Sequence, residues 1–163
     1  MGNPLHPPEA NEYWNHITWA TRWRIPHFQD ITLGEACLRA IERERRRLGL
    51  NVFAYSLLPD HIHLLIGPTK QRTGYVVQAL KLASVHRLMA DGLATGGLWQ
   101  RGYFDRALQD LSQLRSAIDY VHNNPVLAGI VLEPDKYILS SYADWLELRE
   151  GPILLAREEL NLI

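Results

Sequence analysis

Two histidines stand one residue apart, at His61 and His63, inside the apolar run LLPDHIHLLIGP. If this run is a strand, alternation puts both imidazoles on one face of the sheet. The side chains of Ile62, Leu64 and Ile66 then point to the opposite face, toward a core. Imidazoles two residues apart on a strand can bind one cation, because their ring nitrogens can converge. A pair of surface histidines on an open sheet face is the alternative for so short a motif.

The histidine pair is incomplete as a metal site. No third histidine follows it, and the single Cys37 supplies no cysteine pair, so further ligands must come from elsewhere in the fold. Open coordination positions are typical of a catalytic metal. Here they suit a metal that holds a phosphate oxygen during a reaction.

The segment DLSQLRSAIDYVHNN, residues 110–124, predicts a helix with a tyrosine outside its apolar stripe. That stripe consists of Leu111, Leu114, Ile118 and Val121. Tyr120 and Asn124 are i, i+4 neighbours and share a face roughly opposite to it. A tyrosine hydroxyl, with a pKa of about 10, is a poor nucleophile at neutral pH, but a cation that neutralises charge on a phosphate offsets this weakness. The product would be a covalent phosphotyrosine. The alternative is a tyrosine packed on a second contact surface, with its hydroxyl hydrogen-bonded.

The elements that must position these residues alternate between strand and helix patterns. Thr32 and Glu35 form a capping-box pattern at the start of the first helix, and Gly49 suits its end. The last helix is expected to stop at Asn124, because Pro125 disfavours a helical residue before it. Strands are predicted at residues 13–24, 51–58, 61–66 and 103–108, and helices at residues 32–48, 74–92 and 110–124.

This order of elements predicts an α+β fold of the ferredoxin-like sandwich type, with a mainly antiparallel sheet. We expect the helices to cover one face of the sheet and the other face to stay partly open. The 163 residues suit a single domain spanning 1–163, with a core at about 13–145 and an acidic tail at 146–163.

The charge distribution permits an anionic partner without demanding one. Residues 1–132 carry fourteen basic and eleven acidic side chains, while residues 133–163 carry three basic and seven acidic ones. The lone Cys37 can form no internal disulfide, and the apolar runs are too short to span a membrane, so we expect a cytoplasmic location without a membrane partner.

Four blocks of the sequence, taken in order, resemble the REP-associated tyrosine transposases. They are LLPDHIHLLI, LWQRGYFDRAL, IDYVHNNPVLAGIV and KYILSSY, and the resemblance spans roughly Tyr13 to Trp145. These proteins form part of the HUH single-tyrosine transposases, named for their His-hydrophobic-His motif. The resemblance implies that His61 and His63 bind a divalent metal, Mg²⁺ or Mn²⁺. It also implies that Tyr120 is the nucleophile and that Asn124 is the third metal ligand.

The activity implied by this resemblance is cleavage and rejoining of single-stranded DNA near a hairpin, in DNA transposition. The tyrosine would bond to the 5′ side of the phosphate and release a free 3′-OH, without ATP. Asn124 is a neutral ligand and weaker for a hard cation than a carboxylate. Whether Tyr120 serves the histidines of its own subunit or of a partner, and hence whether the protein acts as a monomer or a homodimer, stays open.

Six side chains are candidates for DNA contact, each with a structural alternative. Arg22 and Arg24 lie in the first strand region, where a solvated strand edge is the alternative. Trp99 and Arg101 lie in a loop where bases could stack and phosphate could bind, or where the tryptophan anchors the loop to the core. Lys81 and Arg87, on the second helix, are similar candidates.

Two other functions compete with the transposase hypothesis. A domesticated DNA-hairpin binding protein without cleavage activity would bind hairpins but cut nothing in any divalent metal. A small metal-dependent phosphoesterase unrelated to DNA would use water as nucleophile, and would therefore keep its activity without Tyr120.

Overall fold

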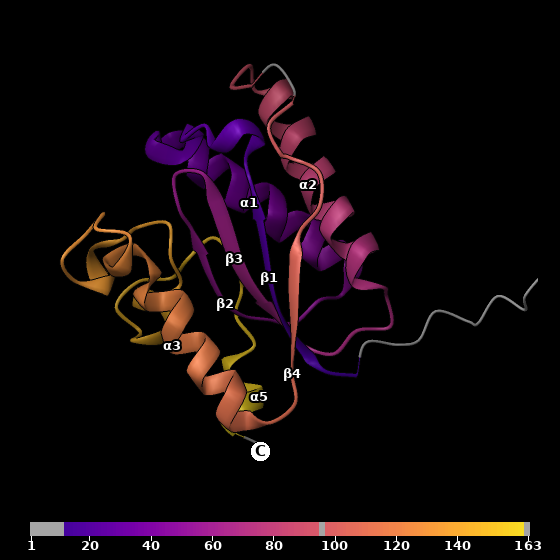
Figure 1. Ribbon diagram of the computed structural model, residues 1–163, viewed down its shortest axis with the longest axis vertical. Coiled ribbons are helices and arrows are strands. Elements are labelled where there is room, and N and C mark those ends of the chain that lie inside the picture. Colours follow the sequence, from indigo (N-terminus) through magenta and orange to yellow (C-terminus); the bar gives the residue numbers. More distant parts are fainter. Residues whose placement is uncertain (1–11, 95–96, 162–163) are drawn as a thin grey trace, which may run out of the picture.

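The computed structural model describes residues 12–94 and 97–161 and contains one four-stranded sheet. Its strands lie in the order β2-β3-β1-β4, and every neighbouring pair is antiparallel (Figure 1). The strands are β1 (Trp14–Ala20), β2 (Val52–Leu57), β3 (His61–Ile66) and β4 (Phe104–Leu108). The sequence-based prediction of an α+β fold with an antiparallel sheet is confirmed.

Two long helices, α1 (Ile31–Leu48) and α2 (Thr73–Ala90), lie side by side against one face of the sheet (Figure 1). Ile62 and Leu64 of β3 and Ile17 of β1 are fully buried in the core beneath these helices. The alternation predicted for the histidine strand is therefore correct, because its isoleucines and Leu64 face this core.

The start of α1 differs from the predicted capping box. The carboxylate of Asp30 caps the helix and accepts hydrogen bonds from the amides of Thr32 and Leu33, at 2.9 and 3.3 Å. Thr32 lies inside the first turn, because an aspartate two residues earlier already satisfies the free amides. Gly49 ends the helix with φ 66°, as its position in the sequence predicts.

The third long helix, α3 (Leu111–Leu127), packs on the opposite face of the sheet from α1 and α2. Its Leu114, Ile118 and Val121 form a second core cluster with Phe53 and Leu65 of the sheet. The expectation that helices cover one face holds for α1 and α2 only. The reason is the stripe of α3 itself, which needs an apolar partner surface and finds one on β2 and β3.

The predicted end of this helix at Asn124 is wrong, since α3 continues through Pro125 to Leu127. Pro125 lacks the amide that would bond to the carbonyl of Val121, and it lies only two residues before the helix ends. The amide of Ala128 donates to the carbonyl of Asn124 at 2.8 Å, so the helical pattern resumes beyond the proline. The continuation keeps Asn124 within the regular helix, one turn after Tyr120.

The chain after α3 runs back along the outer edge of β2. Leu57 donates its amide to the carbonyl of Leu139 at 2.8 Å, and Ala156 donates to Val52 at 2.8 Å. Ile153 is fully buried in the core. These contacts satisfy an edge that would otherwise expose backbone groups.

The remaining short elements are η1 (Arg22–Arg24), η2 (His27–Gln29), η3 (Pro134–Lys136), α4 (Tyr142–Trp145) and α5 (Arg157–Asn161). None of the helices described is both long and apolar enough to span a bilayer.

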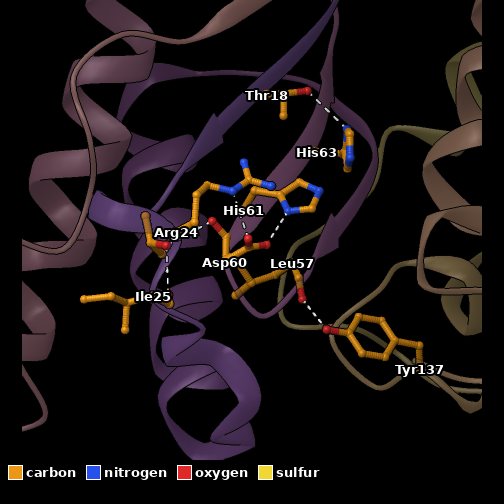
Figure 2. Close-up of polar contacts among 9 residues, drawn as sticks. Thr18, Arg24, Ile25, Leu57, Asp60, His61, His63 and Tyr137 are labelled. Atoms are coloured by element: carbon orange, nitrogen blue, oxygen red, sulfur yellow. Dashed lines mark hydrogen bonds and ion pairs between the residues drawn. The ribbon is translucent and has the colours of Figure 1, made fainter. Parts of the chain in front are cut away.

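One buried hydrogen bond ties this returning segment to the histidine hairpin. The hydroxyl of Tyr137 donates to the carbonyl of Leu57 at 2.6 Å, close to the turn that leads into β3 (Figure 2). Tyr137→Phe should lower the free energy of unfolding by about 1–3 kcal/mol, because it leaves a buried carbonyl without a donor. Urea unfolding followed by circular dichroism measures this loss.

Tyr142→Phe is the matched control for that substitution. Within residues 12–94 and 97–161, the Tyr142 hydroxyl has no hydrogen-bond partner, so its removal should change stability by less than about 0.5 kcal/mol. Equal effects of the two substitutions would contradict the role assigned to the Tyr137 hydrogen bond.

Candidate functional site

The two histidines of β3 project from the sheet face opposite to α1 and α2, as the strand pattern predicts. The ring centroids of His61 and His63 lie 5.0 Å apart. Strand pairing adds β1 to this surface, because Thr18 lies opposite His63 and His16 lies opposite Leu65. Residues directly opposite one another in a sheet point to the same face. Four side chains of β1 and β3 therefore form one polar group on this face.

His63 is almost completely buried, with 6% of its surface exposed, and only one of its ring nitrogens is bonded. Its Nδ1 contacts Nε2 of His16 at 3.0 Å and Oγ1 of Thr18 at 3.1 Å. Its Nε2 is buried and has no hydrogen-bond partner in the described part of the chain. Burial, followed by the neighbouring His16 and His61, lowers the pKa of His63 to about 3. The ring is therefore neutral at pH 7 and is held on one side only, which is the form of histidine that binds metals.

His61 is held through the same ring atom by an acidic partner (Figure 2). Its Nδ1 lies 2.7 Å from Oδ1 of Asp60, and Oδ2 of Asp60 in turn pairs with Nε of Arg24 at 2.9 Å. A carboxylate on Nδ1 fixes the orientation and tautomer of an imidazole and leaves Nε2 for another ligand. Both histidines of the motif are thus anchored through Nδ1, by different partners.

The backbone that presents Arg24 is strained. Trp23 and Arg24 adopt φ values of 59° and 55°, in the left-handed region that non-glycine residues rarely enter. Trp23 is 78% exposed, and the guanidinium of Arg22 lies 5.5 Å from the centroid of its ring. Such conformations persist where surrounding contacts hold them, as the ion pair between Arg24 and Asp60 does here.

Tyr120 reaches this group of side chains from α3 of the same chain. Its ring centroid lies 5.7 Å from that of His63 and 5.9 Å from that of His16, in edge-to-face contacts. The side chain is 48% exposed, so solvent or a substrate can reach its hydroxyl. The structure therefore brings the predicted nucleophile and the histidine motif together within one subunit.

Asn124 lies one helical turn after Tyr120 and is buried. Its side chain interacts with that of His63 and raises the pKa of that ring against the lowering effect of burial. Its Nδ2 is also without a hydrogen-bond partner among the described residues. The two orphaned buried atoms, one on His63 and one on Asn124, are polar groups that a further ligand could satisfy.

Across the residues described, no group of three or more His, Cys, Asp or Glu side chains is arranged to hold a metal ion. A cation at this site would therefore depend on the amide of Asn124 in addition to His61 and His63. An oxygen donor beside two imidazoles is compatible with Mn²⁺ or Mg²⁺, with several positions left open.

The remaining predicted DNA-contact residues are largely engaged in contacts within the protein. Lys81 donates its ammonium to the carbonyls of Gln100 and Gly102, at 2.9 and 2.6 Å. Arg87 pairs with Asp91 at 2.7 Å. These two side chains lie on α2, which covers the sheet face opposite to the histidines.

Trp99 has the anchoring role that was its alternative. Its indole Nε1 donates to Oγ of Ser84 at 2.9 Å, and its ring packs against Phe28 and Trp19, with centroids 5.4 and 5.9 Å away. Arg101 is exposed in the same loop. Among contacts between described residues, Arg24 alone of the six candidates is linked to the histidine site by a chain of direct contacts.

Sequence reasoning missed His16, Thr18 and Asp60 as members of the site. His16 occupies a strand position of the right parity in YWNHITWA, but only the register between β1 and β3 shows which residues lie beside His63. The charge of Arg106 on β4 also reaches His16: burial and then this guanidinium lower the pKa of His16. Asp60 precedes the motif directly, and a carboxylate at that position could have been considered as a partner of His61.

Comparison with known proteins identifies relatives of this chain. The ISDra2 transposase TnpA of Deinococcus radiodurans is 29% identical over 110 residues, which cover 61% of this chain and 79% of that protein. A candidate REP-associated tyrosine transposase of Haemophilus influenzae is 29% identical over 89 residues, and the match spans 48% of this chain and about half, 51%, of that relative.

The fold also has a solved counterpart. The structure of a REP-associated tyrosine transposase bound to a REP hairpin aligns with a TM-score of 0.72 at 20% identity, covering 96% of this chain and 93% of that one. The family model described as "Transposase IS200 like" matches residues 9–124, a segment that contains the histidine motif, Tyr120 and Asn124. The transposase family predicted from the four sequence blocks is thereby confirmed: the chain belongs to the IS200-like transposase family.

Proposed function

We propose that this protein cleaves and rejoins single-stranded DNA beside a hairpin, with Tyr120 as the nucleophile. The observation that carries the proposal is the edge contact, within one chain, between the exposed ring of Tyr120 and the half-bonded ring of His63. A hairpin as partner is supported by the solved relative of the same fold, which is bound to a REP hairpin. The family of the chain supports a role in transposition.

A divalent metal, Mg²⁺ or Mn²⁺, fits the donor set of this site. Nε2 of His61, Nε2 of His63 and the amide oxygen of Asn124 would hold it. The fit rests on the buried, unpartnered Nε2 of His63 and on the anchoring of each imidazole through Nδ1. When bound, such an ion neutralises charge on a phosphate and makes its phosphorus easier to attack.

The chain itself supplies the nucleophile and its orientation. The Tyr120 hydroxyl loses its proton as its oxygen bonds to phosphorus, the bond from phosphorus to the 3′ oxygen breaks, and that oxygen leaves as a 3′-OH after taking up a proton. The DNA end is then held as a 5′-phosphotyrosine. Attack by a 3′-OH on this linkage reverses the step, so that no bond energy is lost and no ATP is needed.

Removal of the Tyr120 hydroxyl tests the nucleophile assignment. A hairpin oligonucleotide with single-stranded extensions, incubated with Mn²⁺, should yield a covalent protein–DNA adduct on a denaturing gel. Tyr120→Phe should lower the yield by more than about 1000-fold, because no other group replaces a missing nucleophile. Mass spectrometry should place the nucleotide on Tyr120.

Tyr75→Phe is the matched control, since Tyr75 is similarly exposed but lies on α2, which packs against the opposite sheet face. It should form the adduct at the normal rate. An adduct that persists in Tyr120→Phe would contradict the assignment. Strand cleavage without any adduct would indicate a water nucleophile, and tight hairpin binding without cleavage in any divalent metal would favour the hairpin-binding function.

The anchoring of the histidines predicts which neighbours matter for metal binding. His16→Phe and Asp60→Ala should each weaken Mn²⁺ binding by about 10–100-fold in the DNA complex of the Tyr120→Phe protein, measured by calorimetry. Asp60→Ala removes the carboxylate that holds Nδ1 of His61, and His16→Phe removes one of the two groups that contact Nδ1 of His63, the other being Thr18. His86→Gln, a change at an exposed histidine on α2, should leave the affinity unaltered. Unchanged Mn²⁺ affinity in His16→Phe would show that the anchor on His63 is dispensable.

A further inference from the structure

The sheet face that carries the histidines is covered over only part of its width. α3 packs mainly over β2 and β3, and it meets β4 near Leu108, at the end of that strand. The two β4 side chains that share this face farther along the strand are Phe104 and Arg106, and both are exposed. An open strip of sheet therefore adjoins Tyr120.

Phe104 is an unusual side chain to leave in solvent. It is 79% exposed, although burial of a phenylalanine stabilises a protein by about 1.5–3 kcal/mol. Arg106 is exposed and makes no hydrogen bond or ion pair with any of the residues that the structure describes. An aromatic ring and a free guanidinium, two residues apart on one strand, thus point from the same face.

The register of the sheet aligns this pair with the active-site side chains. Phe104 lies opposite Thr18, which in turn lies opposite His63, so these three residues form one row across β4, β1 and β3. Arg106 lies opposite His16 in the next row. Because neighbouring strands are about 4.8 Å apart, Phe104 sits about 10 Å from His63 along the sheet. A single DNA strand whose scissile phosphate lies between Tyr120 and His63 could then continue over Phe104 and Arg106.

We propose that Phe104 and Arg106 form a subsite that binds the single-stranded nucleotide next to the scissile phosphate. The ring of Phe104 stacks on the base, and the guanidinium of Arg106 binds the adjoining phosphate. The inference rests on the proposed function, because it takes the phosphate at Tyr120 as its reference point. It adds the residues that hold the unpaired DNA on the open side of the site.

Single-stranded DNA fits this strip better than a paired duplex or a second copy of the chain. Only an unpaired, unstacked base offers its flat face to an aromatic ring. A second copy pairing with β4 would use the backbone groups along the strand edge, whereas Phe104 and Arg106 point out of the sheet plane. The positive charge of Arg106 also matches a phosphate.

Binding measurements on metal-free Tyr120→Phe protein test this subsite under conditions in which the DNA is not cleaved. Fluorescence anisotropy compares a bare hairpin with the same hairpin carrying single-stranded extensions. Phe104→Ala should weaken binding of the extended oligonucleotide by about tenfold and leave the bare hairpin unaffected, and Phe104→Trp should restore binding. Arg106→Ala should lower the slope of log affinity against log salt by about 0.7, while Arg106→Lys should keep it.

Exposed residues elsewhere supply the controls. Leu132→Ala, at a position that is 95% exposed, and Arg39→Ala on α1 should leave binding of both oligonucleotides unchanged. A 2-aminopurine base placed next to the scissile phosphate should lose fluorescence on binding, and Phe104→Ala should abolish that loss.

If Phe104→Ala bound the extended oligonucleotide as tightly as the Tyr120→Phe protein in which it is made, the proposed subsite would be wrong. If Phe104→Ala changed the oligomeric state in analytical ultracentrifugation but left DNA binding unchanged, the strip would instead be a contact surface for a second copy of the chain. These binding measurements need neither metal nor the Tyr120 hydroxyl. A negative result for the subsite is therefore distinguishable from a negative result for the proposed cleavage chemistry.

Discussion

The arrangement of the site depends on the way the ring of His63 is held. The ring is buried in the sheet surface, and its Nδ1 contacts both His16 and Thr18 of the neighbouring strand. A buried imidazole that is neutral and fixed on one side presents a single lone pair in a single direction. The antiparallel register of β1 and β3 produces this geometry, because it sets Thr18 directly opposite His63. A slip of one residue would turn β1's polar side chains into the core.

The division of the helices between the two sheet faces gives the site its shape. α1 and α2 bury one face over β1, β2 and β3, and α3 packs on the other. The apolar stripe of α3 docks on β2 and β3, which sets the rotation of the helix and leaves Tyr120 beside His63, with the buried Asn124 one turn further along the helix. The uncovered part of the same face, along β4, carries the exposed Phe104 and Arg106, where we propose that unpaired DNA binds.

The sequence predicted the placement of the central side chains better than that of their neighbours. The alternation around His61 and His63 and the stripe of α3 are local patterns, so the outward-facing histidines and the exposed Tyr120 could be predicted from them. His16 could not, because its role depends on a pairing between strands 47 residues apart along the chain. Lys81 and Trp99 show the converse, since a cation and an aromatic ring that suit DNA are used here to fix a loop.

The close approach of Tyr120 to His63 and His16 in one chain indicates that the proposed active site is assembled within one subunit. Mixing Tyr120→Phe protein with His63→Ala protein, in the presence of Mn²⁺ and a cleavable hairpin oligonucleotide, tests it directly. A site assembled within one subunit predicts no covalent adduct, because neither variant has both the nucleophile and the histidine pair. An adduct on the His63→Ala chain would contradict the account, since it would show that Tyr120 serves the histidines of a partner subunit.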